Sequence, residues 1–214
     1  MISGTRSSKR LLLPLAILAC SPASALDAPT LIAALAHSPP ATTRFVEVGF
    51  VSMLDQPLLL RGELTWRGDA QLEKRIDSPY RETTIINGEN VEVRRDKKSP
   101  RQFTLDRAPE LRGFLASFTA LLSGNAVLLQ QYHTLALSGD EHAWRITLTP
   151  RDAALGKRIR SIDVYGSETA LRCFNVQQTD GDNNVLLVEQ LASAKLPAAL
   201  TLPHMNALCS GAAN

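Results

Sequence analysis

The sequence has almost no excess charge of either sign, and this limits its partners. It contains 23 lysine and arginine residues against 21 aspartate and glutamate residues, which gives a formal net charge of +2 at pH 7. Binding to a nucleic acid backbone needs a concentrated surface of lysine and arginine. The composition therefore does not favour nucleic acid as a partner. A chain of 214 residues is long enough for one domain with a real core.

Motifs for metal binding and hydrolytic catalysis are also missing. No two of the four histidines, His37, His133, His142 and His204, have the spacing of a zinc site. The two carboxylates of residues 180–182 are too few ligands for calcium, and a turn explains them better. There is no Gly-x-Ser-x-Gly sequence. We predict no metal, no cofactor and no enzymatic activity, although a catalytic triad built from distant residues would leave no local signature.

The most apolar segment lies near the N-terminus and is too short to cross a membrane. Residues 11–19 are apolar, but a membrane-spanning helix takes about 20 residues. Three basic residues precede this segment, and the small residues of Ala23-Ser24-Ala25 follow it. This order is typical of a signal peptide. We predict that residues 1–25 are removed and that residues 26–214 form a single domain in the periplasm of a Gram-negative-type envelope.

A second processing site competes with the first. Cleavage before Cys20, in Ile17-Leu18-Ala19-Cys20, would leave a cysteine that can be lipidated, as in bacterial lipoproteins. The bulky Leu18 makes this a poor match, so cleavage after Ala25 is favoured. That cleavage removes three basic residues and no acidic residue, which changes the formal charge from +2 to −1.

Two cysteines, Cys173 and Cys209, remain after this cleavage. An even number of cysteines in an oxidising compartment favours a disulfide, which would join the C-terminal tail to a late strand. Two buried free thiols are the alternative.

Alternation of apolar and polar residues predicts an antiparallel sheet. In residues 58–66 the even positions are apolar apart from Gly62, and residues 46–50 and 72–76 follow a similar pattern. Asn87-Gly88 predicts a tight hairpin turn, and further turns are expected near residues 139 and 181. The fold class is therefore mainly β, with a sheet of about ten or eleven strands.

Two or three helices are expected beside this sheet. Helical spacing of apolar residues appears in residues 31–36 and 111–122, and a shorter helix is expected in residues 127–132. So few helices cannot cover a flat sheet of this size, so the sheet should curl around them into an unclosed, strongly curved barrel. An incompletely filled interior would hold an apolar ligand. A fully packed core is the alternative.

The order of several segments resembles one family, the periplasmic outer-membrane lipoprotein carrier LolA and its diverged relatives. The resemblance covers about residues 43–192 and lies in Gly62-x-Leu64-x-Trp66-Arg67, Leu72-x-Lys74, Pro79, Ile85-Ile86-Asn87-Gly88-x-x-Val91, Trp144-x-Ile146-x-Leu148-x-Pro150, Ile159-x-x-Ile162-x-Val164 and Asp180-Gly181. It implies an unclosed barrel of eleven strands capped by helices. Its hydrophobic cavity would hold lipoprotein acyl chains between an inner-membrane release complex and an outer-membrane acceptor, without bond chemistry.

The resemblance also suggests a role for Arg67. Typical members have Arg-Pro on an early strand, whereas this chain has Arg67-Gly68-Asp69. Arg67 is therefore the candidate gating residue. Because the chain departs from the family pattern here, its cargo is open to a second interpretation, which is another amphiphile such as a glycolipid or a pigment. A lipid-anchored acceptor that uses Cys20 is a third.

The cavity lining is predicted from the apolar faces of the strands and of the second helix, and we expect a monomer. The predicted lining residues are Val46, Val48, Phe50, Leu58, Leu60, Leu64, Trp66, Phe114, Leu115, Phe118 and Leu122. Each of them could also be ordinary core, because every packed element needs an apolar face.

Overall fold

The computed structural model describes residues 26–212. The predicted signal peptide, its cleavage site and Cys20 lie outside the described residues. The side chain of Phe114 also lies outside them, although its backbone belongs to a helix.

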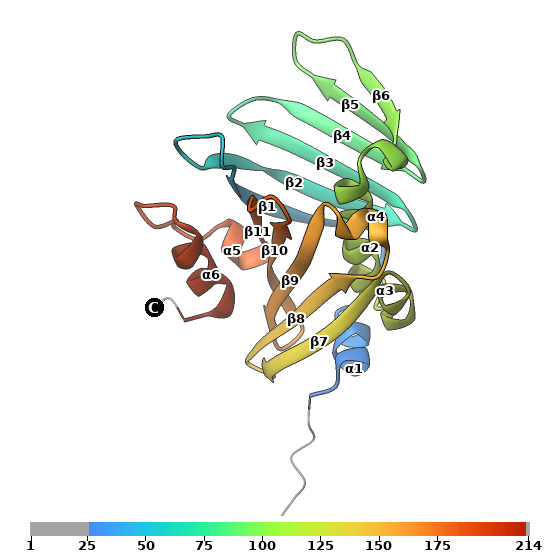
Figure 1. Ribbon diagram of the computed structural model, residues 1–214, viewed down its shortest axis with the longest axis vertical. Coiled ribbons are helices and arrows are strands. Elements are labelled where there is room, and N and C mark those ends of the chain that lie inside the picture. Colours follow the sequence, from blue (N-terminus) through green and yellow to red (C-terminus); the bar gives the residue numbers. More distant parts are fainter. Residues whose placement is uncertain (1–25, 213–214) are drawn as a thin grey trace, which may run out of the picture.

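Within residues 26–212, eleven strands form one antiparallel sheet that does not close (Figure 1). Their order across the sheet is β6-β5-β4-β3-β2-β1-β11-β10-β9-β8-β7, so β6 and β7 are its edges. The strands are β1 (Ala41–Phe50), β2 (Leu58–Gly68), β3 (Gln71–Ser78), β4 (Glu82–Asn87), β5 (Asn90–Arg95), β6 (Arg101–Thr104), β7 (His133–Asp140), β8 (Ala143–Pro150), β9 (Ile159–Ser167), β10 (Ala170–Gln178) and β11 (Asn183–Val188). The predicted fold class, an unclosed and curved antiparallel sheet with helices, is confirmed.

Helices cover both faces of this sheet. The described helices are α1 (Ala28–Ala34), the 3-10 helix η1 (Leu105–Arg107), α2 (Pro109–Leu122), α3 (Ala126–Tyr132), α4 (Ala153–Gly156), α5 (Glu189–Ala192) and α6 (Leu202–Ser210). Helices α1 to α4 lie on the concave side, whereas α5 and α6 lie on the other side of β9 to β11 (Figure 1). The expected helices correspond to α1, α2 and α3, and the sequence analysis did not predict α6.

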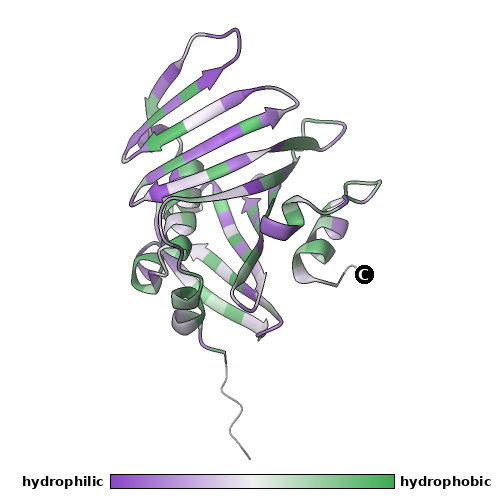
Figure 2. Cartoon of the chain, turned by 180° about the vertical axis from the view of Figure 1, so that it is seen from behind, coloured by the Kyte–Doolittle hydropathy of each residue, from purple (hydrophilic) through white to green (hydrophobic). Residues whose placement is uncertain are grey.

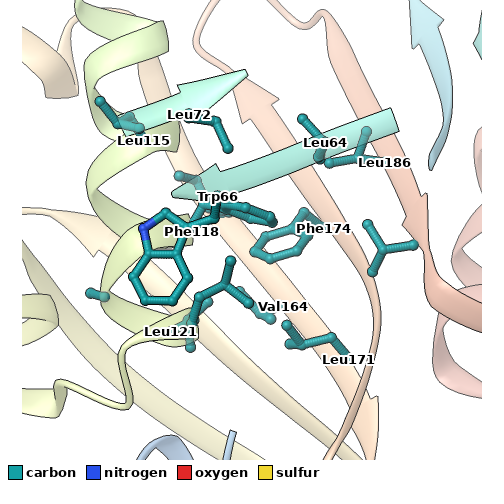
Figure 3. Close-up of a cluster of buried hydrophobic side chains, with 14 of the residues drawn as sticks. Leu64, Trp66, Leu72, Leu115, Phe118, Leu121, Val164, Leu171, Phe174 and Leu186 are labelled. Carbon is teal, nitrogen blue, oxygen red and sulfur yellow. The ribbon is translucent and has the colours of Figure 1, made fainter. Parts of the chain in front are cut away.

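The main core lies between the concave face and the helices α1 to α3. Apolar and polar residues alternate along the strands, which Figure 2 shows as alternating colours on β3 to β6. On the concave face Leu64, Trp66 and Leu72 meet Phe118 of α2 and Phe174 of β10 (Figure 3). The inner face of the sheet is therefore held to α2 by large apolar side chains.

A second core lies on the convex face, and it corrects one prediction. In the β1–β2 pairing Val46 stands opposite Arg61, whereas Phe45 stands opposite Gly62. Directly paired residues of an antiparallel sheet share a face. Val46, Val48 and Phe50 therefore do not share a face with Leu64 and Trp66, and their assignment to that face is wrong. They belong to the cluster beneath α5 and α6.

The C-terminal helix is fixed to this convex face by covalent and polar contacts. Cys173 of β10 and Cys209 of α6 form a disulfide, which confirms the predicted pair. Arg172 donates hydrogen bonds to the carbonyls of Cys209 and Leu208, at 3.1 and 2.9 Å. Val46 and Val48 of β1 belong to the same convex cluster as Ala192 of α5 and Met205 of α6, so β1 has buried apolar side chains on this face as well as Phe45 on the other.

Candidate functional site

A cavity of about 340 Å³ lies under the concave face of the sheet. We call it the sheet cavity. Side chains of β1 to β6 and β9 to β11 line it, together with the start of α2. Its lining is mainly apolar and includes Leu64, Leu72, Ile76, Ile86, Val176 and Leu186. Its volume is at the lower end of the range for ligand pockets, roughly 300 to 1,000 Å³.

One ion pair lies within this apolar lining. The Nζ of Lys74 on β3 contacts Oε2 of Glu47 on β1, and only 27% and 17% of the two side chains are exposed. The same Nζ lies 5.2 Å from the centre of the Phe45 ring, which is within the range of a cation–π interaction. The sheet cavity is therefore mainly apolar, with this ion pair and Glu82 as its charged groups.

Gly62 lies between the two members of this pair. Glu47 is paired with Leu60 and Lys74 with Leu64, so the ion pair crosses β2 at the position between these leucines. That position is Gly62, which has no side chain to fill the space. A Cβ on Gly62 would also lie 1.7 Å from the carbonyl oxygen of Arg75, so glycine is required here. Because Gly62 has no side chain, the ring of Phe45 and the side chain of Lys74 have room on this face.

A second hollow, the hairpin pocket, lies beyond the sheet cavity where the β2–β3 turn faces α2 and α3. Its volume is about 680 Å³, and Trp66, Leu115 and Arg67 line it. The Trp66 Nε1 donates a hydrogen bond to the carbonyl of Asp69 at 3.2 Å. The Arg67 Nη2 lies 3.0 Å from Oε2 of Glu73, and 55% of its side chain is exposed. Arg67 is thus placed at the rim of an opening.

A third hollow, the His37 pocket, has a volume of about 250 Å³ and lies between α2 and the start of β1. Phe118 and Leu122 line it together with His37 and Glu189. The His37 Nε2 lies 4.0 Å from Oε1 of Glu189. Burial raises the pKa of Glu189, and the nearby His37 opposes this shift.

The sequence places this protein in a known family. Residues 19–212 match the family described as outer membrane lipoprotein carrier protein LolA-like. The chain belongs to this family. The LolA-like family is one of carriers, so the curved sheet and its cavity are the fold of a lipid- or lipoprotein-binding carrier.

Solved structures show more distant likeness. A LolA superfamily protein from Nitrosomonas europaea is 11% identical, with a TM-score of 0.42, over 78% of this chain and 93% of that one. LprF from Mycobacterium bovis is 10% identical, with a TM-score of 0.35, over 82% and 95%. A structure of the Pseudomonas aeruginosa MucA/MucB complex is 12% identical, with a TM-score of 0.39, over 84% and 60%. No curated protein matches the sequence.

The residues predicted to line the LolA-like cavity are distributed over several places. Leu64 lines the sheet cavity. Trp66 and Leu115 line the hairpin pocket, and Phe118 and Leu122 line the His37 pocket.

Two further predicted residues do not line any of these three hollows. Leu60 is buried in the main core, and Leu58, at the start of β2, is 38% exposed. The sequence analysis missed most of the cavity lining, both apolar residues such as Ile76, Ile86 and Leu186 and every polar one, namely Glu47, Lys74, Glu82, Thr84, Gln178 and Asn184. For Lys74 a signal was present, because it stands between Leu72 and Ile76 on the apolar side of the alternation.

Among residues 26–212, no three histidine, cysteine or carboxylate side chains gather closely enough to hold a metal ion. In the same part of the chain, no helix has the length and the apolar character that a membrane span requires.

Proposed function

We propose that this protein is a periplasmic carrier that shields the acyl chains of a lipoprotein during transfer from the inner to the outer membrane. The observation that carries the proposal is the apolar sheet cavity in a chain that belongs to the LolA-like family. An inner-membrane release complex would load the carrier, and an outer-membrane acceptor would receive the cargo.

The energetics of acyl chains support a carrier. Each methylene group exposed to water costs about 0.8 kcal/mol, so one bare chain of about 16 carbons costs on the order of 10 kcal/mol. A protein that moves such a chain through water must cover most of it. The apolar lining of the sheet cavity, with residues such as Leu64 and Leu186, provides that cover.

Helix α2 is the element whose movement would enlarge the cavity. It separates the three hollows, because Leu111 lines the sheet cavity, Leu115 the hairpin pocket and Phe118 the His37 pocket. Its N-cap residue, Ala108, makes no side-chain capping hydrogen bond. Displacement of α2 would join these spaces, and its return would expel cargo without nucleotide hydrolysis.

The cargo can be identified directly. The protein should be purified from the periplasm without detergent, and bound lipids should be extracted and analysed by mass spectrometry. Recovery of a triacylated peptide supports a lipoprotein carrier. Recovery of free glycolipid or pigment instead supports the second candidate function, a carrier of another amphiphile, which the Glu47–Lys74 pair in the cavity favours. Absence of any bound lipid would count against both.

The form of the N-terminus needs a separate measurement. Mass spectrometry of the purified protein should show a chain that begins at Leu26, as expected for a released carrier. A lipidated Cys20 would instead indicate an anchored acceptor.

A further inference from the structure

We propose that the Glu47–Lys74 pair recognises an uncharged group with both hydrogen-bond donors and acceptors, a sugar hydroxyl or an amide, at the head of the acyl chain. This inference rests on the proposed carrier function and adds the chemical class of the cargo. The geometry points to it because the pair lies in the wall of the sheet cavity, among apolar side chains that could only contact hydrocarbon.

The pair has unused hydrogen-bonding capacity. An ammonium group has three donors and a carboxylate has two acceptor oxygens. Within the described residues, the contact between Nζ of Lys74 and Oε2 of Glu47 is the only polar side-chain contact of either residue. Donors of Lys74 and an oxygen of Glu47 therefore remain for a ligand that enters the cavity.

Stability alone does not account for this pair. A partly buried ion pair gains little over apolar side chains of similar size, because both charges lose hydration. The chain nevertheless places it on the inner face, in the gap that Gly62 leaves on β2. The comparison pair Glu63–Arg75 joins the neighbouring strands β2 and β3 on the outer face, where water reaches it, with a distance of 2.7 Å.

The rest of the polar lining favours an uncharged head over an anion. Asn184, Gln178 and Thr84 also line the cavity, and each side chain both donates and accepts hydrogen bonds. The charged lining residues are Glu47, Glu82 and Lys74; Glu47 is paired with Lys74, and Glu82 is paired with Arg95 at 3.6 Å. Among the described lining residues a phosphate or carboxylate would thus find no unpaired cation and would have to displace Glu47 from Lys74, whereas a hydroxyl or an amide can bind Lys74 and Glu47 together.

Four probes with the same decyl-length chain test this inference on the purified full-length protein. They are decyl glucoside, N-decanoylglycinamide, decanoate and decyl phosphate, and their Kd values are measured by displacement of the fluorescent apolar dye N-phenyl-1-naphthylamine. We expect the glucoside or the amide to bind about tenfold more tightly than the two anions. A single hydrogen bond to a charged group contributes about 1.5 kcal/mol, which corresponds to about a factor of ten in Kd. Preference for the glucoside identifies a glycolipid head, and preference for the amide identifies an acylated peptide.

Variants show whether the pair is responsible. In Glu47→Leu/Lys74→Met the preference should disappear while all four probes still bind, whereas the outer-face control Glu63→Leu/Arg75→Met should keep it. The exchange Glu47→Lys/Lys74→Glu restores donors and acceptors and should recover the preference if the apolar variant folds poorly. Equal binding of all four probes to the wild-type protein, or a preference unchanged in the apolar variant, overturns the inference and leaves the carrier function standing. If no probe displaces the dye, both proposals fail.

Discussion

The rings of Phe118 and Phe174 lie with their centres 5.6 Å apart and their planes tilted by 50° (Figure 3). This contact joins α2 to β10, and it fills the concave side between the sheet cavity and the His37 pocket. Aromatic pairs of this geometry contribute about 1 kcal/mol beyond their buried area. This contact holds α2 against the sheet, so a ligand that enters between them would have to separate the two rings.

Truncation of this contact should loosen the interior. We expect Phe118→Ala to lower the free energy of unfolding by about 3 to 5 kcal/mol, because it leaves a void in the main core. The same void should increase the binding of N-phenyl-1-naphthylamine. Chemical denaturation and dye fluorescence measure the two effects. Phe50→Ala, on the convex face, is the control and should leave dye binding unchanged; equal dye binding in Phe118→Ala and the wild type would contradict a closing role.

Photo-crosslinking tests which face meets the cargo. A photoreactive amino acid at Leu186, in the sheet cavity, or at Phe118, on α2, should capture acylated cargo in the periplasm. The same photoreactive amino acid at position 63, in place of Glu63, lies on the outer face and should not capture cargo. Mass spectrometry of the crosslinked species provides the readout. Similar yields at all three positions would show that cargo does not bind on the concave side.

The disulfide should contribute to stability and leave binding unaffected. Cys173 and Cys209 are 36 residues apart, and closing a loop of this length stabilises a protein by about 4 kcal/mol in the chain-entropy model. Cys173→Ala/Cys209→Ala should lower the unfolding free energy by about this amount, as should reduction of the wild type. Dye binding should persist, because the bond lies on the convex face. An identical denaturation curve with and without reductant would mean that the bond is absent in solution.

Gly62 should not tolerate a side chain. Its Cβ would overlap the Arg75 carbonyl oxygen, so Gly62→Ala must shift β3 against β2. We expect a loss of at least about 2 kcal/mol, typical of overpacking. Gly156→Ala is the matched control, since nothing lies within 4 Å of the added atom. Thermal unfolding of both variants should show a lower Tm for Gly62→Ala only.

His133 should make the fold sensitive to acid. Its side chain is fully buried, and in the described residues neither ring nitrogen has a hydrogen-bond partner. Burial lowers the pKa of His133 from its ordinary value of 6.5. The unfolded chain therefore binds a proton before the folded protein does, and stability should fall as the pH drops below about 6.5, until the lowered pKa is reached.

Replacement of this histidine checks the sign of the effect. Tm measured between pH 7.5 and 5 should decrease less in His133→Met than in the wild type, each compared with its own value at pH 7.5. His142→Gln replaces an exposed histidine and is the control; its Tm should decrease between pH 7.5 and 5 as much as that of the wild type. A His133→Met curve parallel to the wild type would assign the acid sensitivity to other groups.

The sequence predicted the sheet well because alternation and turns are local signals. It could not assign the faces of β1, since Phe45 and Val46 are both fully buried and no alternation distinguishes them. The convex face of β1 is covered by α5, and the same apolar cluster continues to α6. The start and end signals of α6 were present in the sequence: Thr201 accepts a hydrogen bond from the His204 backbone N–H, and Gly211 ends the helix with a positive φ. The Glu47–Lys74 contact depends on which residues stand opposite across three strands, and this register is not a local property.

The free edges of the sheet have a consequence for the range of cargo. A closed barrel has a circumference fixed by its strand number and stagger. Here β6 and β7 are not joined to each other within the described residues, so the two ends can move apart while every ladder between neighbouring strands stays intact. The gap between β6 and β7 would let the curvature of the sheet, and with it the width of the interior, change, so ligands of different size could bind to the same fold.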